Sequence, residues 1–220
     1  PLYSSAASDV YKRQIINSSK IISELKKMIK FPPNPFVIKD GFLSAFQFMS
    51  KKGNSSQLFN LNLNGFWDSC WIVFFVNAVV STLASYGIKA NIDGDIQSGI
   101  LPRLLLITII DICLFSILVN TIFEKIGKGD KFFKFIIPFN WIQSFQAILM
   151  LSFAVLGLIL PPSIFVFFGI MVVIWVTFSL WRIGKEEVGL SGWGATGMIF
   201  LSVIIEASLG MFSRSLSMTI

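Results

Sequence analysis

Two acidic residues, Asp111 and Glu206, lie within long apolar segments of this 220-residue sequence. An ionised carboxylate in hydrocarbon costs ~2.5 kcal/mol or more, so acids at such positions face a protein interior and are candidates for ion binding or proton transfer. No Lys or Arg lies deep in either segment, so we expect both carboxyls to be protonated or hydrogen-bonded. They form either a proton- or cation-linked site or a pair of neutral groups that fasten helices together, and we expect the fastening role.

Amide side chains form a second polar group within the apolar part of the sequence. Asn140, Gln143 and Gln146 lie close together, and Asn77 and Asn120 can join them from other segments. Amides in lipid usually bond across helices for ~0.6 to 2 kcal/mol each, so we expect fastening here too, with a substrate path as the alternative. The candidate buried polar or ion-linked site comprises five residues: Asp111, Glu206, Asn140, Gln143 and Gln146.

The sequence offers few groups for catalysis or metal binding. It contains no histidine, and its two cysteines, Cys70 and Cys113, both lie in apolar segments. Zinc sites and hydrolytic enzymes depend on His or on accessible Cys. We therefore predict no catalytic residue, no metal site and no cofactor, and we expect that the protein is not an enzyme.

The run Gly192-Trp-Gly194-Ala-Thr-Gly197 spells a dinucleotide-binding pattern of glycines. That pattern functions only between a strand and a helix, with an acidic residue about twenty positions later. Neither condition holds here, and close packing of helices through small residues is the better interpretation. The predicted packing positions are four: Gly194, Gly197, Ser202 and Gly210.

Composition places the chain in the membrane class, because it is 54% hydrophobic and 14% charged with a mean hydropathy of +0.74. A spanning helix needs about 20 mostly apolar residues. Five segments qualify: residues 69–88, 101–123, 135–160, 163–182 and 193–212. We therefore predict an all-α fold, a polytopic transmembrane helical bundle of about five spans over residues 66–213. Pro161 and Pro162 make the third and fourth spans an antiparallel hairpin.

Basic residues lie mainly on one side of this predicted bundle. When residues 1–14 are left out, thirteen precede the first span or lie at the connections between the second and third or the fourth and fifth spans, whereas three lie on the other side. Lys and Arg accumulate in cytoplasmic loops, so we predict a cytoplasmic N-terminus and an external tail at residues 214–220. The net charge of +6 then reflects contact with lipid headgroups, and no nucleic-acid partner is expected.

The N-terminal region separates into two parts. Residues 1–14 resemble a translated sequencing-library adapter, which would place the natural start near Ile15 or at Met28, and such a segment carries no function. Residues 15–65 form a cytoplasmic segment. Within it, Phe42, Phe46 and Met49 predict either a short amphipathic helix at the membrane interface or a frayed tether.

Three short motifs resemble the Yip1 family of five-span membrane proteins, in an uncharacterised bacterial branch, over roughly residues 55–213. They are Phe59-Asn-Leu-Asn-Leu-Asn-Gly-Phe-Trp67, Phe139-Asn-Trp141 and Val188-Gly-Leu-Ser-Gly192. The resemblance implies a non-catalytic scaffold or assembly partner in the bacterial inner membrane, with a membrane-protein partner or a homo-oligomer. The acidic-aromatic motif by which eukaryotic members engage small GTPases is absent here. The alternative is a small transporter or channel subunit that uses the two intramembrane carboxyls. It requires a water-accessible cavity, whereas a scaffold requires the carboxyls to be sealed between helices.

Overall fold

The computed structural model describes residues 32–91, 100–157 and 161–217, and these ranges are helical apart from short connections. The helices follow in the order α2 (Pro35–Met49), α3 (Ser55–Leu58), α4 (Leu63–Asn91), α5 (Ile100–Lys125), the 3-10 turn η1 (Gly129–Lys131), α6 (Phe132–Leu156), α7 (Pro162–Arg182), the π-helical turn η2 (Ile183–Glu187) and α8 (Gly192–Ser217). Residues 1–14, predicted to derive from an adapter, lie outside the described residues.

Five helices are long and apolar enough to cross a membrane, which confirms the predicted fold class. Their apolar stretches are Leu63–Leu83, Pro102–Lys125, Gly129–Leu156, Val166–Glu187 and Gly192–Phe212. The first spanning helix, α4, begins at Leu63, six residues before the predicted span. The Asn62 side chain accepts a hydrogen bond from the Gly65 amide at 3.0 Å and caps the helix there. The last helix continues to Ser217, so the predicted tail at 214–220 is helical in its first four residues.

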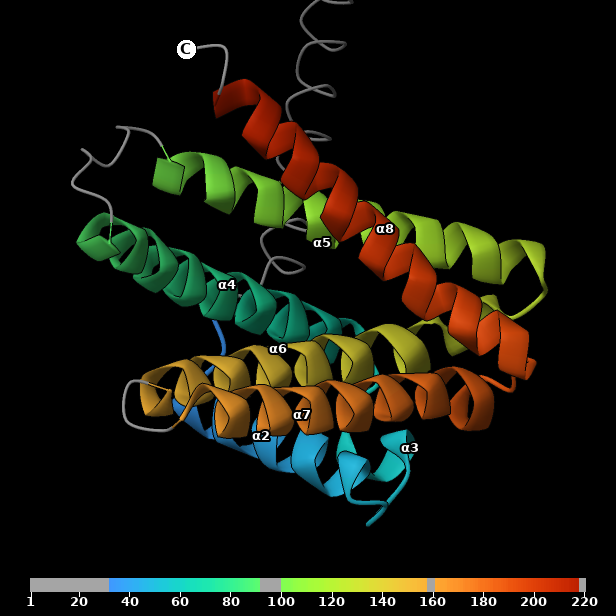
Figure 1. Cartoon of the computed structure of the whole chain (residues 1–220). Coiled ribbons are helices and arrows are strands. Elements are labelled where there is room, and N and C mark those ends of the chain that lie inside the picture. Colours follow the sequence, from blue (N-terminus) through green and yellow to red (C-terminus); the bar gives the residue numbers. More distant parts are fainter. Residues whose placement is uncertain (1–31, 92–99, 158–160, 218–220) are drawn as a thin grey trace, which may run out of the picture.

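The five long helices enclose a central space. Their main contacts follow the order α6, α4, α5, α8, α7 and back to α6 (Figure 1), and α5 also contacts α6, for example where the Phe115 ring meets Phe139. The helices α4, α6 and α8 begin at the end of the bundle where α5 and α7 finish, on the right of Figure 1. We call this the basic end, because it carries Lys125, Lys128, Lys131, Lys134 and Arg182.

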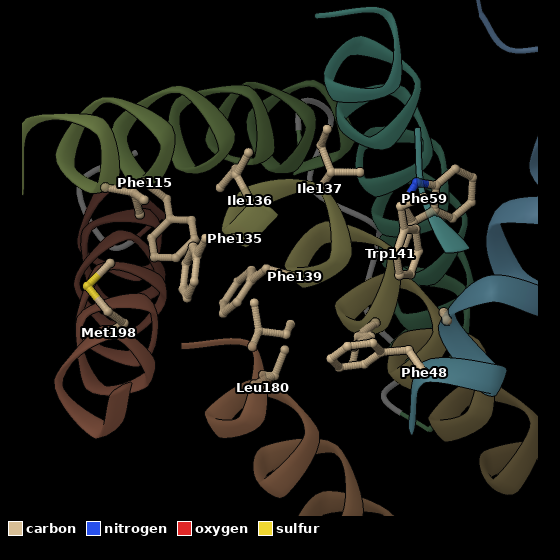
Figure 2. Close-up of a cluster of buried hydrophobic side chains, with 14 of the residues drawn as sticks. Phe48, Phe59, Phe115, Phe135, Ile136, Ile137, Phe139, Trp141, Leu180 and Met198 are labelled. Carbon is tan, nitrogen blue, oxygen red and sulfur yellow. The ribbon is translucent and has the colours of Figure 1, made fainter. Parts of the chain in front are cut away.

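Helix α6 supplies most of the core at the basic end. Phe135, Ile136, Ile137 and Ile142 on successive faces are all at most 1% exposed, so the helix is surrounded on every side at this level. Figure 2 shows aromatic and aliphatic side chains from the neighbouring helices gathered around it. Pro138 lies in the second turn of α6, where it removes one intrahelical hydrogen bond near the helix start without ending the helix.

Helix α2 packs along the α6–α7 hairpin (Figure 1). The Phe42 ring meets Trp141 edge-on at 5.4 Å, and Phe46 meets Trp175 at 6.2 Å. Gly41 lies flat against Trp141, where an added Cβ would overlap the indole ring. The predicted amphipathic segment is therefore a packed helix and not a frayed tether. Its place at the membrane interface stays a prediction.

Charged side chains connect the end of α7 and the following turn η2 to α2 and α3. Arg182 is 6% exposed and donates from Nε to Glu186 at 3.1 Å and from an η nitrogen to the Phe48 carbonyl at the end of α2 at 3.0 Å. Glu187 accepts hydrogen bonds from the backbone amide and the hydroxyl of Ser55. Two adjacent acids beside Arg182 and Lys185 would most simply form a solvated cluster, and Glu186 is exposed. Glu187 instead has a partner, because α3 folds back over this turn and brings Ser55 to it.

Small residues produce one close approach between neighbouring segments, at a place the sequence did not reveal. A Cβ added to Gly184 in η2 would lie 2.8 Å from the Cβ of Ala195 in α8, so the two backbones nearly touch. In contrast, a Cβ added to Gly197 or Gly210 would meet no atom within 4 Å. The predicted packing role of these two glycines is therefore not found within the described residues. A Cβ at Gly194 would meet only Ser191 and Leu190 of the preceding loop.

Candidate functional site

A cavity of about 350 Å³ lies in the space that the five long helices enclose. All five residues of the predicted polar site line it: Asp111 from α5, Glu206 from α8, and Asn140, Gln143 and Gln146 from α6. Asn77 from α4, Thr177 from α7 and Ser202 from α8 add polar groups. Asn120, which we expected to join the amide group, is exposed elsewhere on α5.

The cavity is centred on the middle of the apolar stretches. Its lining comes from 73–77 in α4, 111–115 in α5, 139–150 in α6, 173–180 in α7 and 199–206 in α8. The corresponding apolar stretches run from 63 to 83, 102 to 125, 129 to 156, 166 to 187 and 192 to 212. In every helix the lining residues therefore include or closely flank the midpoint of the stretch. In a bilayer, the cavity would lie near the midplane.

The lining changes character along the cavity. Towards the basic end it is apolar, with Phe115 and Phe139 in contact at a ring-centroid distance of 4.7 Å and Leu180 nearby (Figure 2). Away from the basic end, the chain directions of α5 and α8 place Asp111 and Glu206 beyond this aromatic layer. One end of the cavity is thus closed by rings, and the other carries the acids.

The two carboxyls have no partner in the described part of the chain. Asp111 is half-buried and Glu206 is exposed, and both line the same cavity. No hydrogen bond or ion pair between described residues engages either of them. Among the described residues that line the cavity, none is Lys or Arg.

Only one of the amides fastens helices as expected. Asn140 is 7% exposed, and its Nδ2 donates to the Ser69 hydroxyl on α4 at 3.0 Å. Within the described residues, its side-chain oxygen accepts no hydrogen bond, and neither Gln143 nor Gln146 makes any. Interhelical fastening by these two glutamines is therefore not found among the described residues. The reason is geometric, because their side chains face the cavity instead of a neighbouring helix.

Hydroxyl side chains in the same helices behave differently. Thr108 donates to the Leu104 carbonyl at 3.0 Å, and Ser144 donates to the Asn140 carbonyl at 2.9 Å. A hydroxyl can reach the carbonyl one turn back in its own helix, whereas carboxyls and longer amides cannot use this route and need a partner across space. Asp111, Glu206, Gln143 and Gln146 therefore line the cavity without a hydrogen bond among the described residues.

Comparison of the chain with protein-family models, curated proteins and solved structures gave no match. The resemblance to the Yip1 family gains no support from these comparisons. The function is therefore argued from the cavity and its lining.

A second, shallower hollow lies on the outside of the α7–α8 seam and is almost wholly apolar. Phe178, Trp181 and Phe200 contribute to it. It shares Val173, Thr177 and Ile199 with the central cavity, so single side chains separate the two. Thr177 was not among the site residues predicted from the sequence. Its signal was present, because Val173, Thr177 and Leu180 follow the four- and three-residue spacing of one helix face.

Proposed function

We propose that this chain is a small membrane transporter or channel subunit with a proton- or cation-linked site at Asp111 and Glu206. One observation carries the proposal: five apolar helices surround a cavity at the middle of their apolar stretches, and both acids line it without a partner. Binding sites of secondary transporters lie at this depth. An acid that faced hydrocarbon there would be costly, so we infer that water or a cation reaches the cavity.

The scaffold role was our first expectation, and it required the carboxyls to be sealed between packed helices. The cavity favours transport over that role, because a pair of fastening carboxyls needs partners across the helix contact, and none is found among the described residues. A Yip1-like scaffold or assembly partner stays the competing proposal. The two differ in whether ions move.

Transport can be tested with the purified protein in liposomes that contain a pH-sensitive dye. We expect proton flux in the wild type when inorganic or organic cations are supplied outside the liposomes, and its loss in Asp111→Asn and in Glu206→Gln. Glu124→Gln is the matched control, because Glu124 is an exposed acid on α5 outside the cavity and should be dispensable. Equal flux in all four proteins, or flux in none, would refute the proposal and leave the scaffold role as the better account.

We also propose that the protein lies in the bacterial inner membrane with its basic end in the cytoplasm. The thirteen basic residues predicted on one side against three on the other support this orientation, and the bacterial assignment follows from the Yip1-like motifs alone. A reporter fused after Arg214 should then report an external location. Activity of a cytoplasm-only reporter at that position would reverse the proposed orientation.

A further inference from the structure

The chemistry of the cavity lining identifies a class of ligand, and this step rests on the transport function proposed above. The described lining offers two carboxyls, two glutamine side chains and the side-chain oxygen of Asn140, which accepts no hydrogen bond from the described residues, and none of the described lining residues is basic. Anions would meet uncompensated negative charge here. Cations would meet both opposite charge and hydrogen-bond acceptors.

The size of the cavity argues against a bare inorganic ion. Metal cations are held by oxygen ligands at roughly 2.0 to 2.6 Å, so their sites enclose little free space. A volume of about 350 Å³ instead falls at the lower end of the roughly 300 to 1,000 Å³ typical of small-molecule sites. A compact organic molecule fits this space better than an ion alone.

The apolar part of the lining indicates the chemistry of the rest of the ligand. Phe115 and Phe139, which are 6% and 3% exposed, close the cavity opposite the carboxyls. Aromatic faces stabilise both apolar groups and nearby cations. The apolar hollow outside α7 and α8 shares three side chains with the cavity, which places a lipid-facing surface beside the site.

We propose that the cavity binds a small organic cation, a primary ammonium group attached to an apolar body, in exchange for protons on Asp111 and Glu206. Without a cation in the cavity, the carboxyls at this depth are neutral only when protonated. When the ammonium group binds, it keeps its own three hydrogens and its charge, and each displaced carboxyl proton passes to water. No covalent bond changes. Such competition couples the movement of the amine to the movement of protons.

Two lining residues account for all the protons in this exchange. Among the lining residues that α4, α5, α6, α7 and α8 contribute, only Asp111 and Glu206 ionise. The remaining polar groups of the lining are the amides of Asn77, Asn140, Gln143 and Gln146 and the hydroxyls of Ser144, Thr177 and Ser202. A proton released on binding therefore comes from one of these two acids.

The experiment is calorimetric titration of the purified full chain in detergent micelles with phenethylammonium chloride. Titration at one pH in two buffers of different ionisation enthalpy counts the protons released. We expect saturable binding with proton release, and no binding of 2-phenylethanol, which has the same shape without the charge. Asp111→Asn and Glu206→Gln should each weaken binding at least ~tenfold, which is about 1.4 kcal/mol. Glu124→Gln should bind as the wild type does.

The possible failures are distinguishable. Equal binding of 2-phenylethanol would overturn the inference, because an apolar pocket alone would explain it. Asp111-dependent proton or K⁺ flux in liposomes without phenethylammonium binding would overturn the ligand class and leave the transport function in place. Absence of both flux and binding would refute the two proposals together. The comparison of phenethylammonium with 2-phenylethanol uses wild-type protein, so it decides the question even if a variant fails to fold.

Discussion

Charged side chains have protein partners at the basic end, whereas the carboxyls of the central cavity have none among the described residues. At the basic end, Arg182 is enclosed by Glu186, the Phe48 carbonyl and the Phe48 ring, and Lys128 donates to the carbonyls of Val188 and Gly189 at 2.9 Å each. In the cavity, Asp111 has no such partner in the described residues. Loops can fold back to supply partners at the end of a bundle, whereas the middle of a span has only its neighbouring helices. Polar groups left unpartnered there are consequently available to a ligand.

The largest expected effect concerns Arg182. Arg182→Gln removes the ion pair with Glu186 and leaves the Phe48 carbonyl at the end of α2 without its charged donor. Loss of a buried charged hydrogen bond typically costs ~2 to 3 kcal/mol. We expect the free energy of unfolding in mixed micelles to fall by about this amount. The matched control is Lys185→Gln, since Lys185 is exposed and lies over the Trp181 ring, a contact worth ~0.5 to 1 kcal/mol. Equal losses in the two variants would contradict the network described here.

A pair of glycine substitutions gives a smaller effect with opposite signs. Gly41→Ala places a methyl group against the Trp141 ring, and such overpacking costs ~1 to 3 kcal/mol. The better helix propensity of Ala offsets up to ~1 kcal/mol of this loss. Gly197→Ala gains the same propensity in open space.

We therefore expect Gly41→Ala to destabilise the protein by up to ~2 kcal/mol and Gly197→Ala to stabilise it by up to ~1 kcal/mol. Thermal unfolding in micelles measures both. Destabilisation by Gly197→Ala would indicate that Gly197 takes part in a close helix contact, as predicted from the small-residue pattern.

The sequence predicted the spans and the members of the cavity lining better than their roles. Hydropathy alone located five helices, and the rarity of acids in apolar segments singled out Asp111 and Glu206. What it could not provide was the ring order of the helices. That order decides whether Gln143 faces another helix or an enclosed space, and periodicity along one helix contains no information about the neighbouring helix.

The same limit explains the errors at the basic end. Glu187 is 132 residues from Ser55 in the chain, so no local pattern connects them. Close packing was expected at Gly197 from the spacing of glycines, yet it occurs where Gly184 meets Ala195. A small residue permits a close approach but does not select the partner, which depends on how η2 directs the chain into α8.

The smallest expected effect on stability is at the two acids. It tests the contrast between the central cavity and the basic end most directly. Asp111→Asn and Glu206→Gln keep the size of each side chain and remove only its ability to ionise. Because no described residue pairs with either carboxyl, no hydrogen bond within the protein is lost. The free energy of unfolding should therefore change by less than ~1 kcal/mol, within the range measured for single interhelical hydrogen bonds in membranes.

The loss of unfolding free energy in Arg182→Gln, measured in the same micelles, is the reference for comparison. A loss at Asp111 as large as at Arg182 would mean that the carboxyl is held by a protein partner, and a fastened acid cannot exchange protons for a ligand. A negligible loss of stability together with abolished proton flux would instead mean that the acid acts on a proton or ligand that enters the cavity. A group that contributes little to folding has no structural reason to be an acid at the middle of a span.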